Sequence, residues 1–279
     1  MLTLALVIIL YIFRDILFPD NTNTSGKVVK NKMTGRGSWS SIGGTLAYKT
    51  DKPGPYYKLP IVGTNYIGKK TPTNANERAV VSAVKAYQGA VNKRLAVNIA
   101  VDGVFGPVTH RKVVEFQSRV GESADGAIGP KTSKALLFPD LDRIVKAELL
   151  KYPALGAITP AIVCGVITQE SGWDAGAVGF ADERDVGLAQ INGEAHPEWT
   201  EQERLVPELS FKFVFDYLKM AVNDNQINTI EDAIASYNLG VGGARRWISQ
   251  GRPALYYPPG AAKGRDVWGY INTIKTACK

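Results

Sequence analysis

Apolar residues recur at helical spacing along most of the chain beyond residue 80. The clearest stretch follows Thr159, a favourable N-cap residue, with Pro160 at the first helical position. Four apolar residues then lie on one helical face: Ile162, Val163, Val166 and Ile167. Similar patterns predict helices over residues 80–91, 111–120, 141–152, 207–223, 229–237 and 266–278. We therefore expect a mainly α-helical protein.

The predicted helix that starts at Pro160 carries an acidic residue, Glu170, on its apolar face. A carboxylate in this setting is poorly solvated, which favours its neutral form. A neutral carboxyl group can donate a proton to a leaving oxygen, so Glu170 is a candidate general acid.

A loop over residues 172–184 and a turn at Gly187 follow this helix. Asp185 lies just before the turn, and the amide side chains of Gln190 and Asn192 lie just after it. Such amides can bind the hydroxyl and amide groups of a sugar. Asp185 is the candidate second carboxylate, and the neighbouring Asp182 and Glu183 are alternatives for that role.

Two motifs in this part of the chain resemble those of known families. Glu170-Ser171 followed by Asp185-Val186-Gly187-Leu188-Ala189-Gln190-Ile191-Asn192 resembles the active-site segment of the lysozyme superfamily. Further on, Ala235-Ser236-Tyr237-Asn238-Leu239-Gly240 is similar to the Ala-x-Tyr-Asn-x-Gly motif of the soluble lytic transglycosylases. The resemblance implies a lysozyme-like α-helical catalytic domain that cleaves the β-1,4 bond between N-acetylmuramic acid and N-acetylglucosamine in peptidoglycan. It also implies the catalytic residues Glu170 and Asp185 and the substrate-binding residues Ser171, Gly187, Gln190, Asn192, Tyr237 and Asn238.

The two family patterns disagree about the last step of the reaction. Typical lytic transglycosylases use one catalytic carboxylate and lack an acid at the position of Asp185, whereas animal lysozymes lack the Tyr-Asn-x-Gly motif. Attack by water would give hydrolysis, and attack by the C6 hydroxyl of the muramic acid would give a 1,6-anhydro product. We expect a lytic transglycosylase. The alternatives are a hydrolytic lysozyme that uses Glu170 with Asp185, and an inactive wall-binding structural protein of a virion.

An internal repeat lies upstream of these motifs. Asp102-Gly103-Val104-Phe105-Gly106-Pro107-Val108-Thr109 recurs 23 residues later as Asp125-Gly126-Ala127-Ile128-Gly129-Pro130-Lys131-Thr132. In each copy Asp-Gly predicts a turn, and Gly-Pro predicts the start of a helix. The repeat resembles the small three-helix peptidoglycan-binding domain of bacterial and phage wall hydrolases. The module residues are Asp102, Gly103, Phe105, Gly106, Thr109, Asp125, Gly126, Ile128, Gly129 and Thr132, which serve either as scaffold or in binding.

Length and charge divide the chain into four parts. The 279 residues, 45% hydrophobic and 21% charged, are enough for two modest cores. Residues 1–78 hold 11 Lys and Arg against 4 Asp and Glu, so the net charge of +7 belongs to this region. We expect a hydrophobic anchor or docking helix over 1–18, and a basic segment of unknown fold, containing Gly and Pro, over 19–78. The peptidoglycan-binding domain then covers 79–138 and the catalytic domain 139–279.

The first eighteen residues are apolar except for a few positions that include Arg14 and Asp15. No positive charge precedes this run and no Ala-x-Ala site follows it, which argues against a cleaved secretory signal. We expect residues 1–18 to contact a membrane or a virion protein. The expected location is a phage virion, or the wall side of the host cell envelope as part of a lysis system, with membrane association through the N-terminus.

Few residues are available for metal or redox chemistry. His110 and His196 have no companions at ligand spacing, so we expect no metal and no cofactor. Cys164 lies in the predicted helix, and the default interpretation is that it is a buried free thiol. The alternative is a disulfide with Cys278. No nucleic-acid-binding motif is present, so peptidoglycan is the expected partner.

Overall fold

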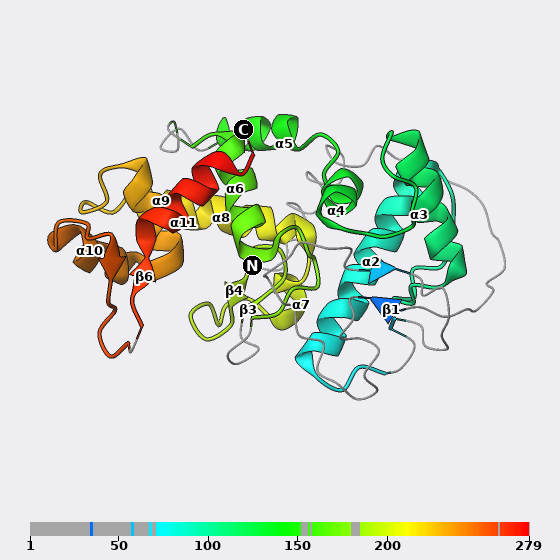
Figure 1. The fold of residues 1–279 in the computed structure, drawn as a ribbon, viewed down its shortest axis with the longest axis horizontal. Helices are drawn as coiled ribbons and strands as arrows, with labels where there is room; N and C mark the ends of the chain where they lie inside the picture. The colour runs from blue at the N-terminus through cyan, green and yellow to red at the C-terminus, as the bar shows by residue number, and fades with distance from the viewer. Residues whose placement is uncertain are drawn as a thin grey trace, which may run out of the picture. The chain divides into compact units, whose positions relative to one another are not determined.

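The structure of the chain is a computed structural model that describes residues 34–35, 57–58, 67–68, 71–151, 156, 158–179, 185–261 and 263–278. The described part is mainly helical, as predicted (Figure 1). It forms two compact units. The first unit combines described residues of Met1–Pro139 with Ser171–Ser210, and the second combines Asp140–Glu170 with Phe211–Lys279. The chain therefore passes between the units three times: after Pro139, within α6 (Pro160–Ser171) and within α8 (Pro207–Val222).

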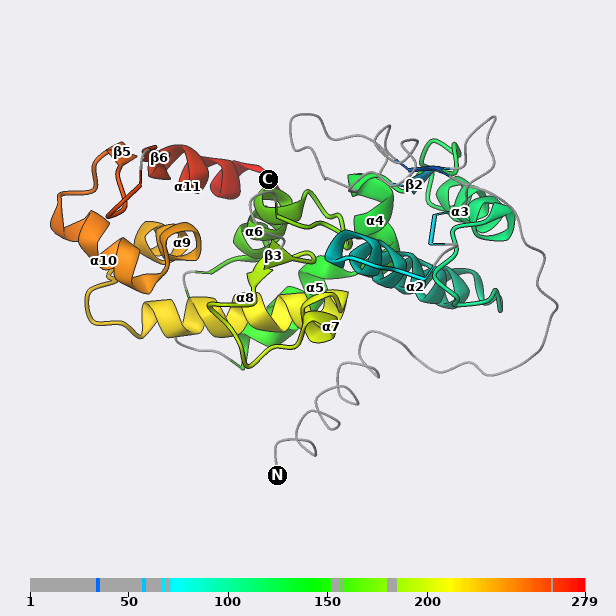
Figure 2. The same cartoon turned by 90° about the horizontal axis from the view of Figure 1, so that it is seen from below.

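The first unit is built around a long helix, α2 (Ala75–Leu95), which packs against α3 (Pro107–Arg119) and α4 (Pro130–Leu137) (Figures 1 and 2). Short strands and one helical turn complete it: β1 (Thr34–Gly35), β2 (Tyr57–Lys58), β3 (Asp185–Val186), β4 (Ile191–Asn192) and α7 (Glu201–Arg204). β1 pairs with β2 and β3 with β4, both antiparallel. Its core holds large side chains that are almost fully buried: Tyr57, Ile67, Tyr87, Phe105, Ile128 and Leu136.

The helix starts of this unit follow from local sequence. The side chain of Asn74 accepts a hydrogen bond from the backbone N–H of Glu77 at 2.9 Å, which caps α2. Both α3 and α4 begin at the proline of a Gly-Pro pair, Pro107 and Pro130. The repeat therefore predicted both helix starts correctly, whereas the apolar pattern placed the start of α2 five residues too late.

The second unit contains the remaining helices and one hairpin. Its elements are α5 (Leu141–Leu149), most of α6 (Pro160–Ser171), most of α8 (Pro207–Val222), α9 (Ile230–Leu239), α10 (Val241–Ser249), β5 (Leu255–Tyr256), β6 (Arg265–Asp266) and α11 (Val267–Thr276). α9 packs against both α10 and α11. Thr229 and Asp232 form a capping box at the start of α9.

The helix α10 was not predicted from the sequence. It follows Gly240, whose φ of +70° is a left-handed conformation, and its first turn contains Gly242 and Gly243. Three glycines in four residues indicate a turn by propensity. The helix nevertheless forms because it buries Ala244 and Trp247 completely.

A disulfide joins Cys164 in α6 to Cys278 just beyond α11. The default interpretation of Cys164 as a free thiol was therefore wrong, and the alternative is confirmed. The two helices also meet at Gly165, where a Cβ atom would lie 2.1 Å from the backbone oxygen of Ile274. Only glycine allows α6 and α11 to approach this closely.

Several sequence predictions fall on residues that the structure does not describe. They are the apolar segment 1–18, most of the basic segment 19–78, and Asp182 and Glu183. Among the described helices, none is both long and apolar enough to span a bilayer. The predicted boundary after Phe138 lies one residue before a border between the two units, which follows Pro139, and the predicted domain limits stay a prediction.

Candidate functional site

The two repeat loops are each held by one buried glutamine. The side chain of Gln88, from α2, accepts a hydrogen bond from the backbone N–H of Gly103 at 2.9 Å. Its amide nitrogen donates to Asp102 at 2.9 Å, to the Val104 carbonyl at 3.1 Å and to Thr109 at 3.2 Å. The first loop is therefore closed around the end of a single side chain.

Gln117, from α3, makes the same set of bonds to the second loop. It accepts from the Gly126 backbone at 2.8 Å and donates to Asp125, to the Ala127 carbonyl and to Thr132 at 2.9–3.2 Å. The repeat thus extends into the preceding helix. The sequence separation differs, because Gln88 precedes Asp102 by 14 residues, whereas Gln117 precedes Asp125 by 8 residues. The aspartates and threonines of the repeat shape the loops, which supports the scaffold interpretation of these residues.

Residues upstream of the predicted module complete both loops. Tyr57 and Ile128 exchange two backbone hydrogen bonds, at 2.8 and 3.3 Å. The backbone carbonyl of Ile67 accepts a hydrogen bond from the backbone N–H of Phe105 at 3.1 Å. Each repeat copy therefore forms an isolated β-bridge with a residue upstream of the module. The Tyr57 hydroxyl group also donates to Asp174 at 3.1 Å. The folded module therefore includes residues outside 79–138.

The segment after α6 packs into the same unit. Ser171 is fully buried and its hydroxyl oxygen accepts a hydrogen bond from the Trp173 backbone at 3.2 Å. The ring of Trp173 is buried, packs edge-on against Phe138 and lies 5.3 Å from the Lys134 amino group. Ser171 therefore contributes to the turn that places Trp173 in the core.

Four of the predicted site residues lie together in the β3–β4 hairpin of the first unit. Asp185 pairs with Asn192 in the strand register, and the Asn192 side chain donates to the Asp185 carboxylate at 2.8 Å. Gly187 has a φ of +76°, and a Cβ atom there would lie 2.2 Å from the Arg204 carbonyl. The side chain of Gln190 donates to the carbonyls of Gly187 and Ala177 at 2.8 and 3.2 Å. These polar groups hold the hairpin in one conformation.

Glu170 lies within a group of tyrosines in the second unit. The hydroxyl group of Tyr270, in α11, donates a hydrogen bond to the Glu170 carboxylate. Burial and the negative charge of Glu170 raise the pKa of Tyr270 and of Tyr237 well above the ordinary value of 10.0. The same electrostatic interaction shows that Glu170 and Tyr237 are close, so the structure brings together two of the predicted site residues.

Aromatic neighbours fix the position of Tyr237. Its ring packs edge-on against Tyr217 at 5.0 Å and against Phe213 at 6.2 Å between centroids. Tyr217 donates to the Ser236 carbonyl at 2.7 Å, and burial raises its pKa to about 12. Asn238, the next motif residue, accepts a hydrogen bond from Arg265 at its backbone carbonyl.

Tyr270 and Tyr217 were missed by the sequence analysis. Tyr270 lies 100 residues after Glu170, in a helix that was predicted only from its apolar pattern. Its contact with Glu170 depends on how α6 and α11 pack. The disulfide, Gly165 and an ion pair between Lys275 and Glu231 on α9 all fix α11 in this position.

Comparison with known families agrees with this geometry. Residues 151–255 match the family model of the transglycosylase SLT domain, and residues 91–136 match that of a putative peptidoglycan binding domain. No curated protein matches the chain. Together with the helical fold, these two matches define a peptidoglycan-degrading enzyme of the glycosidase type. More particularly, the chain is a lytic transglycosylase-type enzyme in which a peptidoglycan-binding domain precedes the SLT domain.

Proposed function

We propose that the enzyme cleaves the β-1,4 bond between N-acetylmuramic acid and N-acetylglucosamine and releases 1,6-anhydromuramic acid ends. The observation that carries this proposal is the position of Glu170, whose carboxylate accepts a hydrogen bond from Tyr270 beside Tyr237. The match of residues 151–255 to the transglycosylase SLT domain supports the reaction type.

In this reaction Glu170 acts twice. Its carboxyl group first donates a proton to the glycosidic oxygen as the bond to the anomeric carbon breaks. Its carboxylate then accepts the proton of the C6 hydroxyl group, whose oxygen attacks the anomeric carbon. Glu170 therefore ends the reaction protonated, as it began, and no water is consumed. Phenols are neutral near pH 7, and the raised pKa values of Tyr237 and Tyr270 extend their neutral range to higher pH, so Tyr270 remains a donor to Glu170.

The contacts of Asp185 favour a structural role for this residue. Its side chain accepts a hydrogen bond from Asn192, and its backbone carbonyl accepts one from Gly179 at 2.8 Å. Both contacts stabilise the hairpin. A transglycosylase needs no second carboxylate, because the substrate supplies the nucleophile.

The peptidoglycan-binding domain suggests that the enzyme acts on the cell-wall side of the membrane. We propose a more specific setting, a phage virion or lysis system in which residues 1–18 dock against a partner protein or membrane. The apolar sequence of this segment supports docking. The intact mass of the protein from its native source tests this, since a mass that lacks residues 1–18 would contradict it.

Two substitutions and the chemistry of the products test the reaction. Glu170→Gln should lower the rate on purified sacculi by about 10²- to 10⁴-fold, because general-acid assistance is lost. Asp185→Asn should retain most of the rate. Asp142→Asn on α5, an exposed acid paired with Lys146, serves as the control for loss of a carboxylate.

Mass spectrometry of the muropeptides distinguishes the outcomes. Anhydro ends with an active Asp185→Asn variant are the expected result. Reducing ends together with an inactive, folded Asp185→Asn variant would instead indicate a hydrolytic lysozyme that uses both carboxylates. A folded wild-type protein that produces no clearing on a peptidoglycan zymogram would indicate an inactive wall-binding protein.

A further inference from the structure

The chain makes a strained turn directly after Glu170. Gly172 has a φ of +60° and Trp173 a φ of +72°, so two successive residues adopt the left-handed conformation. This conformation is costly for a residue with a bulky side chain, and it persists only where the surrounding structure imposes it. Ser171, the last residue of α6, begins the turn, because its carbonyl accepts a hydrogen bond from the Asp174 backbone at 3.1 Å. Groups that hold this turn therefore also hold the end of the helix that carries the candidate acid.

A chain of hydrogen bonds from the folded module holds the turn. Ser133, in α4, donates to the Trp173 carbonyl at 2.5 Å. Its hydroxyl group has a single proton, so the Tyr87 hydroxyl group, 2.9 Å away, must donate to the Ser133 oxygen. The Tyr87 oxygen in turn accepts a hydrogen bond from the Ala175 backbone at 3.3 Å. The chain thus leaves the turn at Ala175, passes through α2 and α4, and returns to the turn at Trp173.

All the side chains of this hydrogen-bond chain are buried. Tyr87 and Ser133 have no exposed surface, and Trp173 is 3% exposed. Successive hydrogen bonds of this kind strengthen one another in a buried setting. Removal of one hydroxyl group would leave a buried backbone group of the turn without its partner. The turn therefore depends on both hydroxyl groups together.

Tyr57, in β2, adds a separate contact to the same turn. Its hydroxyl group donates to the Asp174 carboxylate at 3.1 Å, and the same carboxylate oxygen accepts from the Gly176 backbone at 2.9 Å. A Cβ atom at Gly176 would lie 2.4 Å from the Tyr57 hydroxyl oxygen, so the turn and this side chain are in direct contact. Three elements of the first unit, α2, α4 and β2, thus hold residues 173–176.

We infer that the folded module positions the general acid, Glu170. Its hydroxyl groups, from Tyr57, Tyr87 and Ser133, hold the turn after α6 and thereby the last turn of that helix, which would otherwise fray. The inference rests on the proposed role of Glu170 as the acid. It makes the module necessary for turnover as well as for attachment to the wall, because a catalytic group displaced by about 1 Å can lose about 10²-fold in rate.

The test measures kcat and KM of the full chain on soluble glycan strands. Ser133→Ala and Tyr87→Phe each remove one hydroxyl group and leave the apolar packing in place. Each should lower kcat about 10-fold or more, because the acid is less well oriented, while KM stays within about twofold of wild type. The assays are run below the melting transition of every variant, so that all of the protein is folded. Tyr57→Phe, which removes one bond at the edge of the network, should also lower kcat and serves if a variant in the core does not fold.

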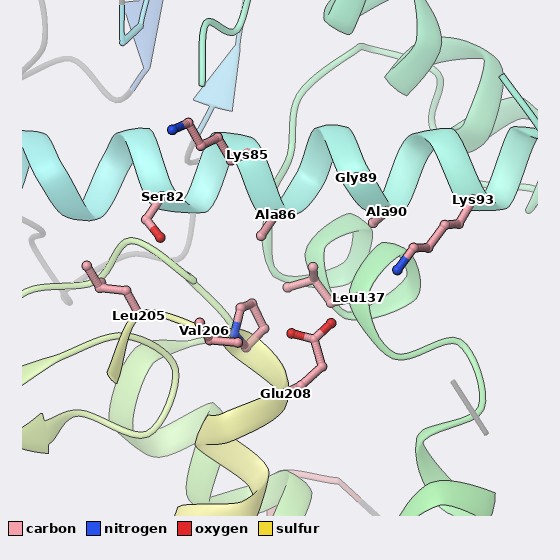
Figure 3. Close-up of a pocket in the computed structure, with 11 residues that line it drawn as sticks. Ser82, Lys85, Ala86, Gly89, Ala90, Lys93, Leu137, Leu205, Val206 and Glu208 are labelled. Atoms are coloured by element: carbon pink, nitrogen blue, oxygen red, sulfur yellow. The ribbon is translucent and has the colours of Figure 1, made fainter. Parts of the chain in front are cut away.

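Ser82→Ala is the matched control, because Ser82 lies on α2 like Tyr87 but on another face of the helix. It lines a groove of the first unit between α2 and residues 205–208, and Figure 3 shows its hydroxyl group directed into this groove. The substitution therefore removes a hydroxyl group from the same helix without removing a bond to the turn. Both kinetic constants should match those of wild type.

Hydrogen exchange of the backbone amides in residues 166–176, followed by mass spectrometry, reports on the turn directly. These amides should exchange faster in the three hydroxyl variants and at the wild-type rate in Ser82→Ala. A general loss of stability would instead accelerate exchange throughout the first unit. The measurement needs no substrate, so it is independent of the reaction.

The inference is overturned if the folded hydroxyl variants keep the wild-type kcat, or if their amides in residues 166–176 exchange at the wild-type rate. A raised KM with an unchanged kcat would also overturn it, because the module would then act in binding alone. Glu170→Gln separates these results from the proposed function. If that variant stays active, the role of Glu170 as the acid fails, whereas full activity of the hydroxyl variants removes only the inference.

Discussion

At the scale of single residues, the contact between Tyr270 and Glu170 determines how the candidate acid is held. The phenol donates a hydrogen bond to the carboxylate, and Tyr237 lies close enough for its pKa to be raised by the same charge. We therefore expect the hydroxyl group of Tyr270 to position the Glu170 carboxylate. Its contribution can be measured separately from that of Glu170.

The variant Tyr270→Phe removes only this hydroxyl group. A hydrogen bond to a charged group contributes about 1.5–3 kcal/mol, so kcat should fall about 10- to 100-fold while KM changes little. Because this donor stabilises the ionised carboxylate, its loss should shift the pH profile of kcat toward higher pH. Tyr217→Phe is the control, because Tyr217 donates to the Ser236 carbonyl rather than to Glu170. An unchanged kcat and pH profile for Tyr270→Phe would show that Tyr270 does not position the acid.

Local sequence signals predicted only part of the site. The motif containing Tyr237 and Asn238 and the helix that ends near Glu170 depend on short-range patterns, and the structure reproduces that helix. The contact with Tyr270 depends instead on the packing of helices that lie 100 residues apart in the sequence. The periodicity of apolar residues does not indicate which helices pack against each other, so Tyr270 was missed.

At the scale of elements, the repeat illustrates the same limit. The Asp-Gly turns and the Gly-Pro helix starts were predicted, because each is a local conformational preference. The glutamines that close the loops were not, because Gln88 and Gln117 precede their loops by different numbers of residues. A buried glutamine is recognisable only once the loop folds around it.

Each glutamine should make a large contribution to the stability of the first unit. Gln88→Met and Gln117→Met keep the side-chain length but leave buried backbone and side-chain groups without partners. Each unsatisfied group costs about 1–3 kcal/mol, so each variant should lose at least about 3 kcal/mol of unfolding free energy in urea titration. The exposed Gln202→Met should change it by less than about 0.5 kcal/mol. If either loop variant is as stable as wild type, its glutamine does not hold the loop.

At the scale of the whole molecule, the chain does not fold as a simple series of sequence segments. Residues Ser171–Ser210 pack in the same unit as the repeat module, and Tyr57 bridges one of its loops. A fragment limited to residues 79–138 would lose these contacts and expose the ring of Tyr87, which is fully buried. Sacculus binding by the module is therefore best measured on the full Glu170→Gln chain, with loop variants as comparison.

The disulfide connects Cys278 to the helix that carries Glu170, and the two cysteines are 114 positions apart in the sequence. Disulfides persist in oxidising compartments, which agrees with a site of action on the wall side of the membrane. Cys278→Ser should lower the unfolding free energy by about 2–5 kcal/mol. It should also lower kcat, because α11 carries Tyr270 and is anchored to α6 by this bond.

Thermal unfolding and kinetics with and without a reducing agent check this expectation. The reductant should lower the melting temperature of wild type to that of Cys278→Ser and leave the variant unchanged. Because Gly165 and the Lys275–Glu231 ion pair also hold α11, activity should fall rather than disappear. If the reduced wild type keeps its full melting temperature and kcat, those two contacts alone are enough to keep Tyr270 in contact with Glu170.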